Sequence, residues 1–172
     1  SGVNGVGKST LIPHLKELLP AKKYVVYDFD KRGVPDGADH TWRKNEIKYW
    51  LEEASRNEKE GKETIVCGFA KKTDFELGAA IEIIVLDATP ETIRERLIKR
   101  YTKNSVFDES QKVIGKPVNE FIDGNVWYAK KMKEECEAAR CPIVDTSTVS
   151  PYQVAARVVS LIQETKYGHT SL

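Results

Sequence analysis

The sequence predicts an α/β fold: a parallel β-sheet with helices on both faces, forming one domain over residues 1–172. Three observations lead to this fold class. A glycine-rich loop at residues 2–10 is followed by an apolar pattern with the period of a helix. Short β-branched and aromatic runs then alternate with longer helical patterns. No internal repeat or low-complexity stretch marks a domain boundary.

Five helices are expected where apolar residues recur every three or four positions. Pro20 closes the first helix and Gly61 ends the second. The third begins at Thr89, whose hydroxyl can cap a helix that has Pro90 in its first turn. Residues 150–153 match a capping box that opens the last helix. The expected helices cover residues 11–19, 39–60, 89–101 and 118–140, and then the chain from residue 150 onward.

Four strands are expected from short runs of β-branched, aromatic and aliphatic residues at 24–29, 63–69, 81–86 and 142–145. A glycine-rich loop of this kind normally follows a buried strand in the middle of the sheet. The given sequence opens at Ser1, directly before the loop. We therefore expect one further apolar strand, roughly five to ten residues long, ahead of Ser1.

The composition limits the classes of partner. The net charge is +1, so the chain as a whole does not attract nucleic acid or an anionic membrane strongly. No apolar run reaches the length that crosses a bilayer. Cys67, Cys136 and Cys141 lack the spacing of metal ligands and are interpreted as reduced thiols. We expect a cytoplasmic monomer or homodimer that acts on a small molecule.

The glycine-rich loop carries the strongest functional signal. The stretch GVNGVGKST fits G-x-x-x-x-G-K-[ST], the phosphate-binding P-loop pattern. Its backbone N–H groups and the start of the following helix favour a bound phosphate. Lys8 is expected to reach the β- and γ-phosphates of ATP, and Ser9 to help hold Mg²⁺. The predicted nucleotide-binding residues are Gly2, Val3, Asn4, Gly5, Val6, Gly7, Lys8, Ser9 and Thr10.

Two carboxylates follow the first expected strand. Asp28 and Asp30 flank Phe29, so alternation along a strand would point both acids to the same side. Ligands of open α/β sheets gather at the carboxyl ends of strands. One acid could bind Mg²⁺, and the other could accept the proton of an attacking hydroxyl. The alternative is a pair of solvated acids in a turn.

Basic and aromatic residues supply further candidates. Arg96 and Arg100 lie four positions apart on one helix face and could neutralise a transferring phosphoryl group. They could instead form a solvated face with nearby glutamates. Arg43 could clamp an anionic or polyhydroxyl substrate, and Trp42 or Trp50 could stack on a base. Trp50 is in phase with apolar neighbours, so core packing is the favoured role for it.

The chain resembles the small P-loop kinases, which include nucleoside, nucleotide, shikimate and gluconate kinases. The resemblance lies in GVNGVGKST, in DFD at a strand end, in LDATPETIRERLIKR and in the late VDTS. It implies a five-stranded parallel sheet in the order 2-3-1-4-5, with the strand before Ser1 at its centre. It also implies a lid over about residues 100–118 that contributes an arginine such as Arg100. Asp28 would be the Mg²⁺-linked acid, and Asp30 the acid that binds the acceptor or acts as base.

The sequence departs from that family in two places. The strand ending near Gly68 lacks the acid that many P-loop ATPases carry there, so Mg²⁺ would rely on Ser9 and Asp28. A D-G-F-P-R motif of the adenylate kinase type is also missing, which weakens the case for a nucleoside monophosphate acceptor.

The leading hypothesis is a Mg²⁺- and ATP-dependent kinase acting on a small metabolite that bears a hydroxyl or a phosphate. The alternatives are an ATPase or GTPase switch, a nucleotide-binding module without catalysis, and an enzyme that modifies nucleic-acid ends. No N-K-x-D motif, which reads guanine, is present.

Overall fold

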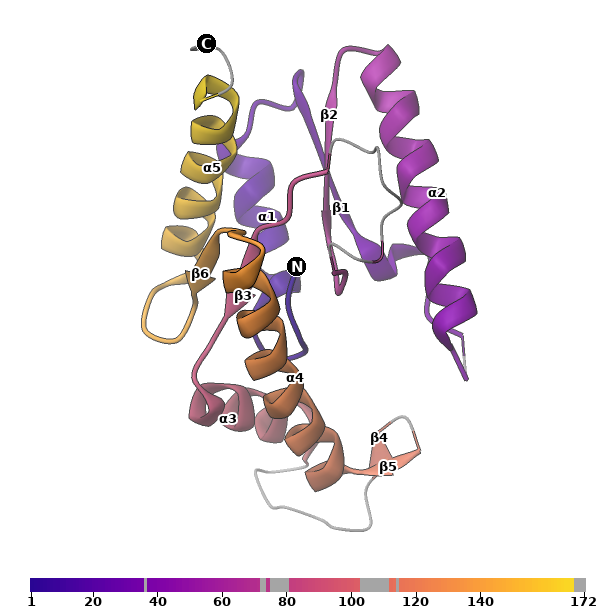
Figure 1. Ribbon diagram of the computed structural model, residues 1–172, viewed down its shortest axis with the longest axis vertical. Coiled ribbons are helices and arrows are strands. Elements are labelled where there is room, and N and C mark those ends of the chain that lie inside the picture. Colours follow the sequence, from indigo (N-terminus) through magenta and orange to yellow (C-terminus); the bar gives the residue numbers. More distant parts are fainter. Residues whose placement is uncertain (36, 72–73, 75–80, 103–111, 114, 169–172) are drawn as a thin grey trace.

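The computed structural model describes residues 1–35, 37–71, 74, 81–102, 112–113 and 115–168. Its helices lie on both sides of short parallel strands (Figure 1), which confirms the predicted α/β class. The helices are α1 (Lys8–Leu18), α2 (His40–Lys59), α3 (Pro90–Tyr101), α4 (Val118–Ala138) and α5 (Pro151–Gly168). The strands are β1 (Tyr24–Asp28), β2 (Glu63–Cys67), β3 (Val85–Asp87), β4 (Lys112–Val113), β5 (Lys116–Pro117) and β6 (Ile143–Asp145).

The parallel strands form two pairs. β1 pairs with β2, and β3 pairs with β6. These are the two outer pairs of the expected order, and within the described residues no strand joins them. Ser1 lies between them: its carbonyl accepts a hydrogen bond from the Leu86 N–H, and its Oγ accepts one from the Ala70 N–H. An apolar groove of about 830 Å³ runs between the pairs. The expected central strand ahead of Ser1 stays a prediction.

The strands are shorter than predicted. β3 begins at Val85 instead of Ile81, because its partner strand β6 follows Pro142, which has no N–H to extend the ladder. β2 ends at Cys67, just before Gly68. β1 ends at Asp28, where its side chain starts the 3-10 helix η1 (Phe29–Arg32).

Helix ends follow the predicted capping residues. The Thr89 hydroxyl accepts a hydrogen bond from the Thr92 N–H at 3.2 Å. At α5 the Ser150 N–H donates to Gln153 Oε1 at 3.0 Å, and the Gln153 N–H donates back to Ser150 Oγ at 3.3 Å. This is the reciprocal pattern of a capping box. The helix caps at Thr89 and Ser150 were therefore predictable from the neighbouring residues in the sequence.

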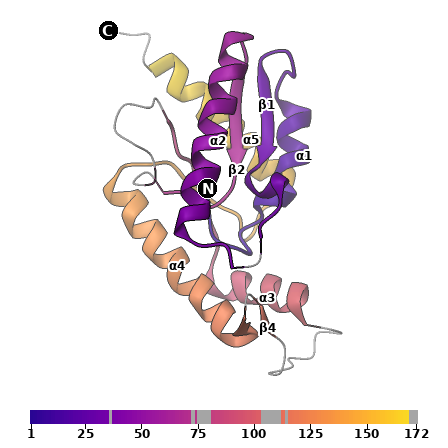
Figure 2. The ribbon, with the colours of Figure 1, turned by 90° about the vertical axis from the view of Figure 1, so that its right-hand side faces the viewer.

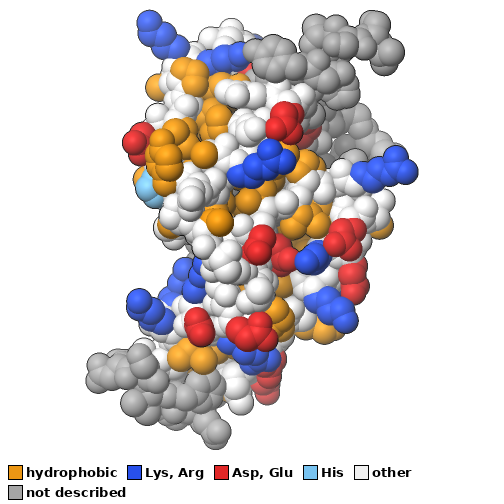
Figure 3. All heavy atoms as spheres, turned by 90° about the vertical axis from the view of Figure 1, so that its left-hand side faces the viewer, with side chains coloured by type: hydrophobic (Ala, Val, Ile, Leu, Met, Phe, Trp, Pro, Cys, Tyr) orange, Lys and Arg blue, Asp and Glu red, His pale blue; other side chains and the backbone are white. Residues whose placement is uncertain are grey.

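The remaining features set the surroundings of the site. Residues 103–111 and 114, which make up most of the predicted lid, lie outside the described residues; the lid stays a prediction. Figure 3 shows the face that carries α5, where acidic, basic and apolar side chains are interspersed. No helix in the described ranges combines the length and apolarity of a bilayer-spanning segment.

The surroundings of Gly68 and Gly124 predict opposite effects of an alanine substitution on the stability of the protein. A Cβ at Gly68 would clash with the buried Phe29, whose Cγ would lie 2.7 Å away. Gly68→Ala should therefore destabilise the protein by about 1–3 kcal/mol. At Gly124, inside α4, an added Cβ meets nothing within 4 Å. Gly124→Ala should stabilise the protein by about 0.5–1 kcal/mol, because glycine loses more entropy in a helix.

Thermal unfolding checks both changes, since 1 kcal/mol shifts the Tm of a domain of this size by roughly 2–4 °C. Equal shifts of the same sign at both positions would contradict the packing described around Phe29.

Candidate active site

The P-loop is shaped by glycines that other residues could not replace. Gly7 has a φ of 95° and occupies the cap position of α1, a left-handed conformation that favours glycine. A Cβ at Gly2 would lie 2.8 Å from the Leu86 carbonyl oxygen and 2.6 Å from a Val6 methyl group. The loop is thus pressed against β3 on one side and opens α1 on the other.

One narrow cavity, of about 40 Å³, lies over this loop. Its lining residues come from the loop and α1, from β1 and η1, from the end of β2, and from α3. They are Asn4, Gly5, Gly7, Lys8, Ser9, Asp28, Asp30, Cys67 and Arg100. The structure therefore brings together five residues predicted for metal binding or catalysis: Lys8, Ser9, Asp28, Asp30 and Arg100.

Lys8 is half-buried beside the loop. Its Nζ donates a hydrogen bond to the Val3 carbonyl at 2.7 Å, which holds the ammonium group against the loop backbone. Burial lowers the pKa of Lys8 to about 8, although the nearby Asp30 carboxylate acts in the opposite direction; Arg100 lowers the pKa further. An ammonium with such a pKa keeps its charge at neutral pH.

Asp28 and Asp30 both line the cavity, but not because they alternate along one strand. The prediction that Asp30 lies in the strand is wrong, because β1 ends at Asp28 and Asp30 lies in η1. Asp28 Oδ1 accepts a hydrogen bond from the Asp30 N–H at 3.0 Å, which forms the turn that keeps both acids together. Burial raises the pKa of Asp30, and the Asp28 charge raises it further.

The oxygen atoms at the cavity fit Mg²⁺. The Ser9 hydroxyl and the Asp28 carboxylate are hard ligands of the kind that magnesium prefers. The described residues contain no group of three or more His, Cys, Asp or Glu side chains placed to hold a metal. Magnesium in nucleotide sites commonly uses one or two protein oxygens besides phosphate and water.

The two candidate arginines of α3 lie in different surroundings. Arg100 lines the cavity. Arg96 lies behind the loop, where Nη1 donates to the Gly5 carbonyl at 3.1 Å and to Thr146 Oγ1 at 3.0 Å. Its Nη2 donates to the Thr146 carbonyl at 2.7 Å. Thr146 Oγ1 in turn donates to the Val6 carbonyl at 3.0 Å. Arg96 therefore positions the loop.

Of the residues predicted for the acceptor, Asp30 lines the cavity, but Trp42 and Arg43 do not. Trp42 packs edge-on against Phe29, with ring centroids 6.2 Å apart. Arg43 Nη1 donates to the Phe69 carbonyl at 2.6 Å, just beyond β2. Trp50 is buried, as its periodicity predicted, and its Nε1 donates to the Phe29 carbonyl at 3.1 Å.

Sequence reasoning missed three residues of the site. Thr146 holds the loop from the end of β6, and only its place in VDTS could have indicated it. Asn125 of α4 accepts a hydrogen bond from the Asn4 N–H at 3.1 Å. Cys67 lines the cavity, and burial raises its pKa to about 11, so it stays a neutral thiol. Figures 1 and 2 both show α3 at one end of the molecule, with α4 running from beside α3 toward the middle.

The bonds of Arg96 predict a strong effect of its removal. Arg96→Ala should cost about 2 kcal/mol, because the Gly5 and Thr146 oxygens would lose charged hydrogen bonds. The Tm should fall by roughly 4–8 °C. Arg94 is the matched control on the same helix, since its exposed ion pair with Asp123 is worth at most about 1 kcal/mol. Comparable losses from both alanine variants would contradict the role assigned to Arg96.

The comparisons with known proteins agree with this geometry. A family model described as an AAA domain matches residues 1–114, which include the loop, both acids and the arginines of α3. No curated protein matches the chain at a significant level. The match covers well over half of the sequence. The chain therefore belongs to the AAA domain family of P-loop nucleotide-binding proteins.

Proposed function

We propose that this protein is an ATP-dependent phosphotransferase, which moves the γ-phosphate of ATP to a small acceptor bearing a hydroxyl or a phosphate group. The observation that carries the proposal is the single cavity shared by the P-loop, Asp28, Asp30 and Arg100. The second carboxylate beside the phosphate loop, Asp30, could accept the proton of an attacking hydroxyl.

The loop and its lysine would bind the triphosphate. Backbone N–H groups of the loop and the start of α1 favour phosphate oxygens, and Lys8 adds a positive charge. Ser9 and Asp28 would hold Mg²⁺. When bound, magnesium neutralises charge on the phosphates. Arg96 keeps the Gly5 carbonyl turned toward α3, so the loop is shaped before nucleotide binds.

Asp30 is the base of the proposed reaction. The acceptor oxygen forms a bond to the γ-phosphorus, the bond from that phosphorus to the β–γ bridging oxygen breaks, and ADP leaves. The hydroxyl proton passes to the Asp30 carboxylate. Arg100, at the cavity wall, would neutralise charge on the transferring group. If the acceptor group is a phosphate, no proton would need to move, and Asp30 could hold the acceptor only through a hydroxyl or amino group, because a carboxylate repels a phosphate anion.

A turnover assay separates transfer from hydrolysis. ATP consumption is measured alone and with each member of a panel of nucleosides, nucleotides, sugars and sugar acids. The proposal expects slow hydrolysis that one acceptor class accelerates, with formation of a phosphorylated product. Fast hydrolysis that no acceptor increases would instead indicate an ATPase.

Replacement of the base gives the sharpest test of the assigned roles. Asp30→Asn should lower kcat by 10²-fold or more, because the amide cannot take up the proton. ATP affinity should change little, since Lys8 and the loop remain. The rate of product formation measures the effect on kcat. Equilibrium binding of a non-hydrolysable ATP analogue measures the effect on ATP affinity. Normal transfer by this variant would refute Asp30 as the base.

The pKa shifts predict a bell-shaped pH dependence of kcat/KM. The acid limb reports Asp30, which must be ionised to accept a proton; its raised pKa moves this limb to higher pH. The alkaline limb reports Lys8, which loses its positive charge as pH rises through about 8 in the free protein. Bound phosphate stabilises the charged ammonium, so ATP affinity should weaken above that pH by up to about tenfold per unit.

Titration of ATP affinity in Lys8→Arg checks the alkaline limb. Arginine keeps its charge, so any affinity that remains should no longer fall between pH 8 and 10. An unchanged decline in this variant would assign the limb to another group.

A further inference from the structure

Two of the three cysteines lie together where α4 ends. Cys136 is in the last turn of the helix and is 5% exposed, and Cys141 is half-buried in the turn that leads to β6. The Cys141 N–H donates to the Cys136 carbonyl at 2.9 Å, and the Cys136 thiol donates to the Cys141 carbonyl at 3.2 Å. These two hydrogen bonds hold the residues next to each other. We call them the cysteine pair.

The turn between the two cysteines has the hydrogen bonds of a Schellman motif. The Cys141 N–H bonds to the Cys136 carbonyl, and the Arg140 N–H bonds to the Glu137 carbonyl at 3.1 Å. The side chains at the two ends of such a motif commonly touch. Arg140 has a φ of 54° and is, within the described ranges, the only residue other than glycine with a positive φ. Strain of this kind persists where the surrounding contacts fix the chain.

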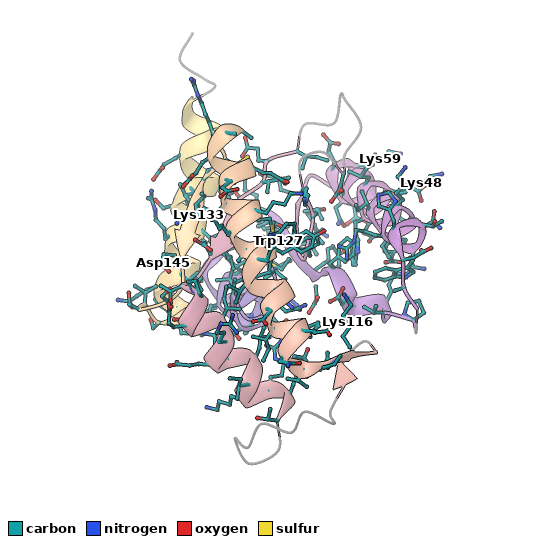
Figure 4. The ribbon with its side chains drawn as sticks, turned by 60° about the horizontal axis from the view of Figure 1, so that its bottom comes forward. Lys48, Lys59, Lys116, Trp127, Lys133 and Asp145 are labelled. Carbon is teal, nitrogen blue, oxygen red and sulfur yellow. The ribbon has the colours of Figure 1, made fainter. Side chains whose placement is uncertain are left out.

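Contacts on both sides of the turn fix it independently of the thiols. Before the turn, Lys133 Nζ pairs with Asp87, the last residue of β3, at 3.3 Å. Figure 4 shows Lys133 and Asp145, the last residue of β6, on the same side of α4. After the turn, the Val85 N–H donates to the Pro142 carbonyl at 2.9 Å. Because β3 holds both α4 and the start of β6, the two thiols stay within reach of each other.

The two thiols of the cysteine pair differ in reactivity. Burial and, to a lesser extent, the neighbouring Cys141 thiol raise the pKa of Cys136 to about 12. Cys136 is therefore a neutral thiol that reacts slowly with reagents from solution. Cys141 is the more exposed of the two. The third cysteine, Cys67, lines the cavity at the P-loop, whereas the cysteine pair does not.

We propose that Cys136 and Cys141 form a site of covalent modification, at which a small disulfide oxidant such as oxidised glutathione is reduced and an internal disulfide is made. The Cys141 sulfur attacks the oxidant as a thiolate, forms a mixed disulfide and displaces one glutathione thiolate. The Cys136 sulfur then attacks the Cys141 sulfur, and the second glutathione leaves. In total the cysteine pair loses two electrons and two protons, and one oxidised glutathione becomes two reduced molecules.

The disulfide would join α4 to the segment before β6 in the arrangement that both already have. Both elements support the P-loop. Asn125 of α4 accepts a hydrogen bond from the Asn4 N–H, and Thr146, directly after β6, donates to the Val6 carbonyl. The bond would therefore stabilise the elements that hold the loop without moving them. The proposal does not depend on the phosphotransferase reaction, and its test measures neither ATP nor an acceptor.

Peptide mapping tests the pairing directly. Reduced protein is incubated with excess oxidised glutathione, unfolded in the presence of N-ethylmaleimide to block free thiols, and digested with trypsin without reduction. Cleavage after Lys133, Arg140 and Arg157 gives peptides 134–140 and 141–157, each with one member of the cysteine pair. These peptides should be separate in the reduced protein and joined by a disulfide in the oxidised protein, with Cys67 blocked in both.

Four outcomes of the mapping would overturn the proposal. They are a protein that keeps all its thiols, a mixed disulfide that persists at Cys141, a disulfide-linked dimer, and a bond that involves Cys67.

Thermal unfolding tests whether the bond fits the folded structure. Oxidised wild type should unfold roughly 4–8 °C above the reduced form, because the bond removes chain entropy from the unfolded state. Cys67→Ser should show the same rise, since it keeps the cysteine pair. Cys141→Ser is the matched control and should show none. A Tm of oxidised wild type that is unchanged or lower, or a rise that persists in Cys141→Ser, would overturn the inference.

Discussion

The site depends on a set of hydrogen bonds that hold the P-loop from behind, which we call the brace. Arg96 donates to the Gly5 carbonyl and to both oxygens of Thr146, and the Thr146 hydroxyl donates to the Val6 carbonyl. A loop that offers its N–H groups to a phosphate turns its carbonyls the other way, and those carbonyls need donors in the interior. The brace supplies these donors from α3 and from the end of β6, so two elements distant in sequence fix the concavity.

Charged side chains gather at the cavity, and bringing them together costs part of their solvation free energy. Lys8 is half-buried and Asp30 lies at the exposed rim of the cavity. Desolvation lowers the pKa of Lys8 and raises that of Asp30, which in both cases favours the neutral form. Each also stabilises the charged form of the other, which offsets part of that cost. Such opposed groups gain most when a polyanion and a metal ion add further charges between them. The site is therefore organised for ligands that bring both signs of charge.

Sequence patterns predicted those features that depend on residues close together in the chain. These features are the loop, the caps at Thr89 and Ser150, and the buried Trp50, each of which depends on residues within one or two turns. The separate places of Arg96 and Arg100 were not predicted, since spacing puts both on one face and Thr146, the deciding partner, is 50 residues away.

The hydrogen bond from Lys8 to the Val3 carbonyl holds the lysine in place without using up its capacity to donate. An ammonium group carries three N–H donors, and this bond engages one of them, so two remain for an incoming phosphate. The side chain has already lost much of its rotamer freedom to the backbone oxygen. A phosphate that binds here therefore loses less side-chain entropy than it would in fixing a freely moving lysine.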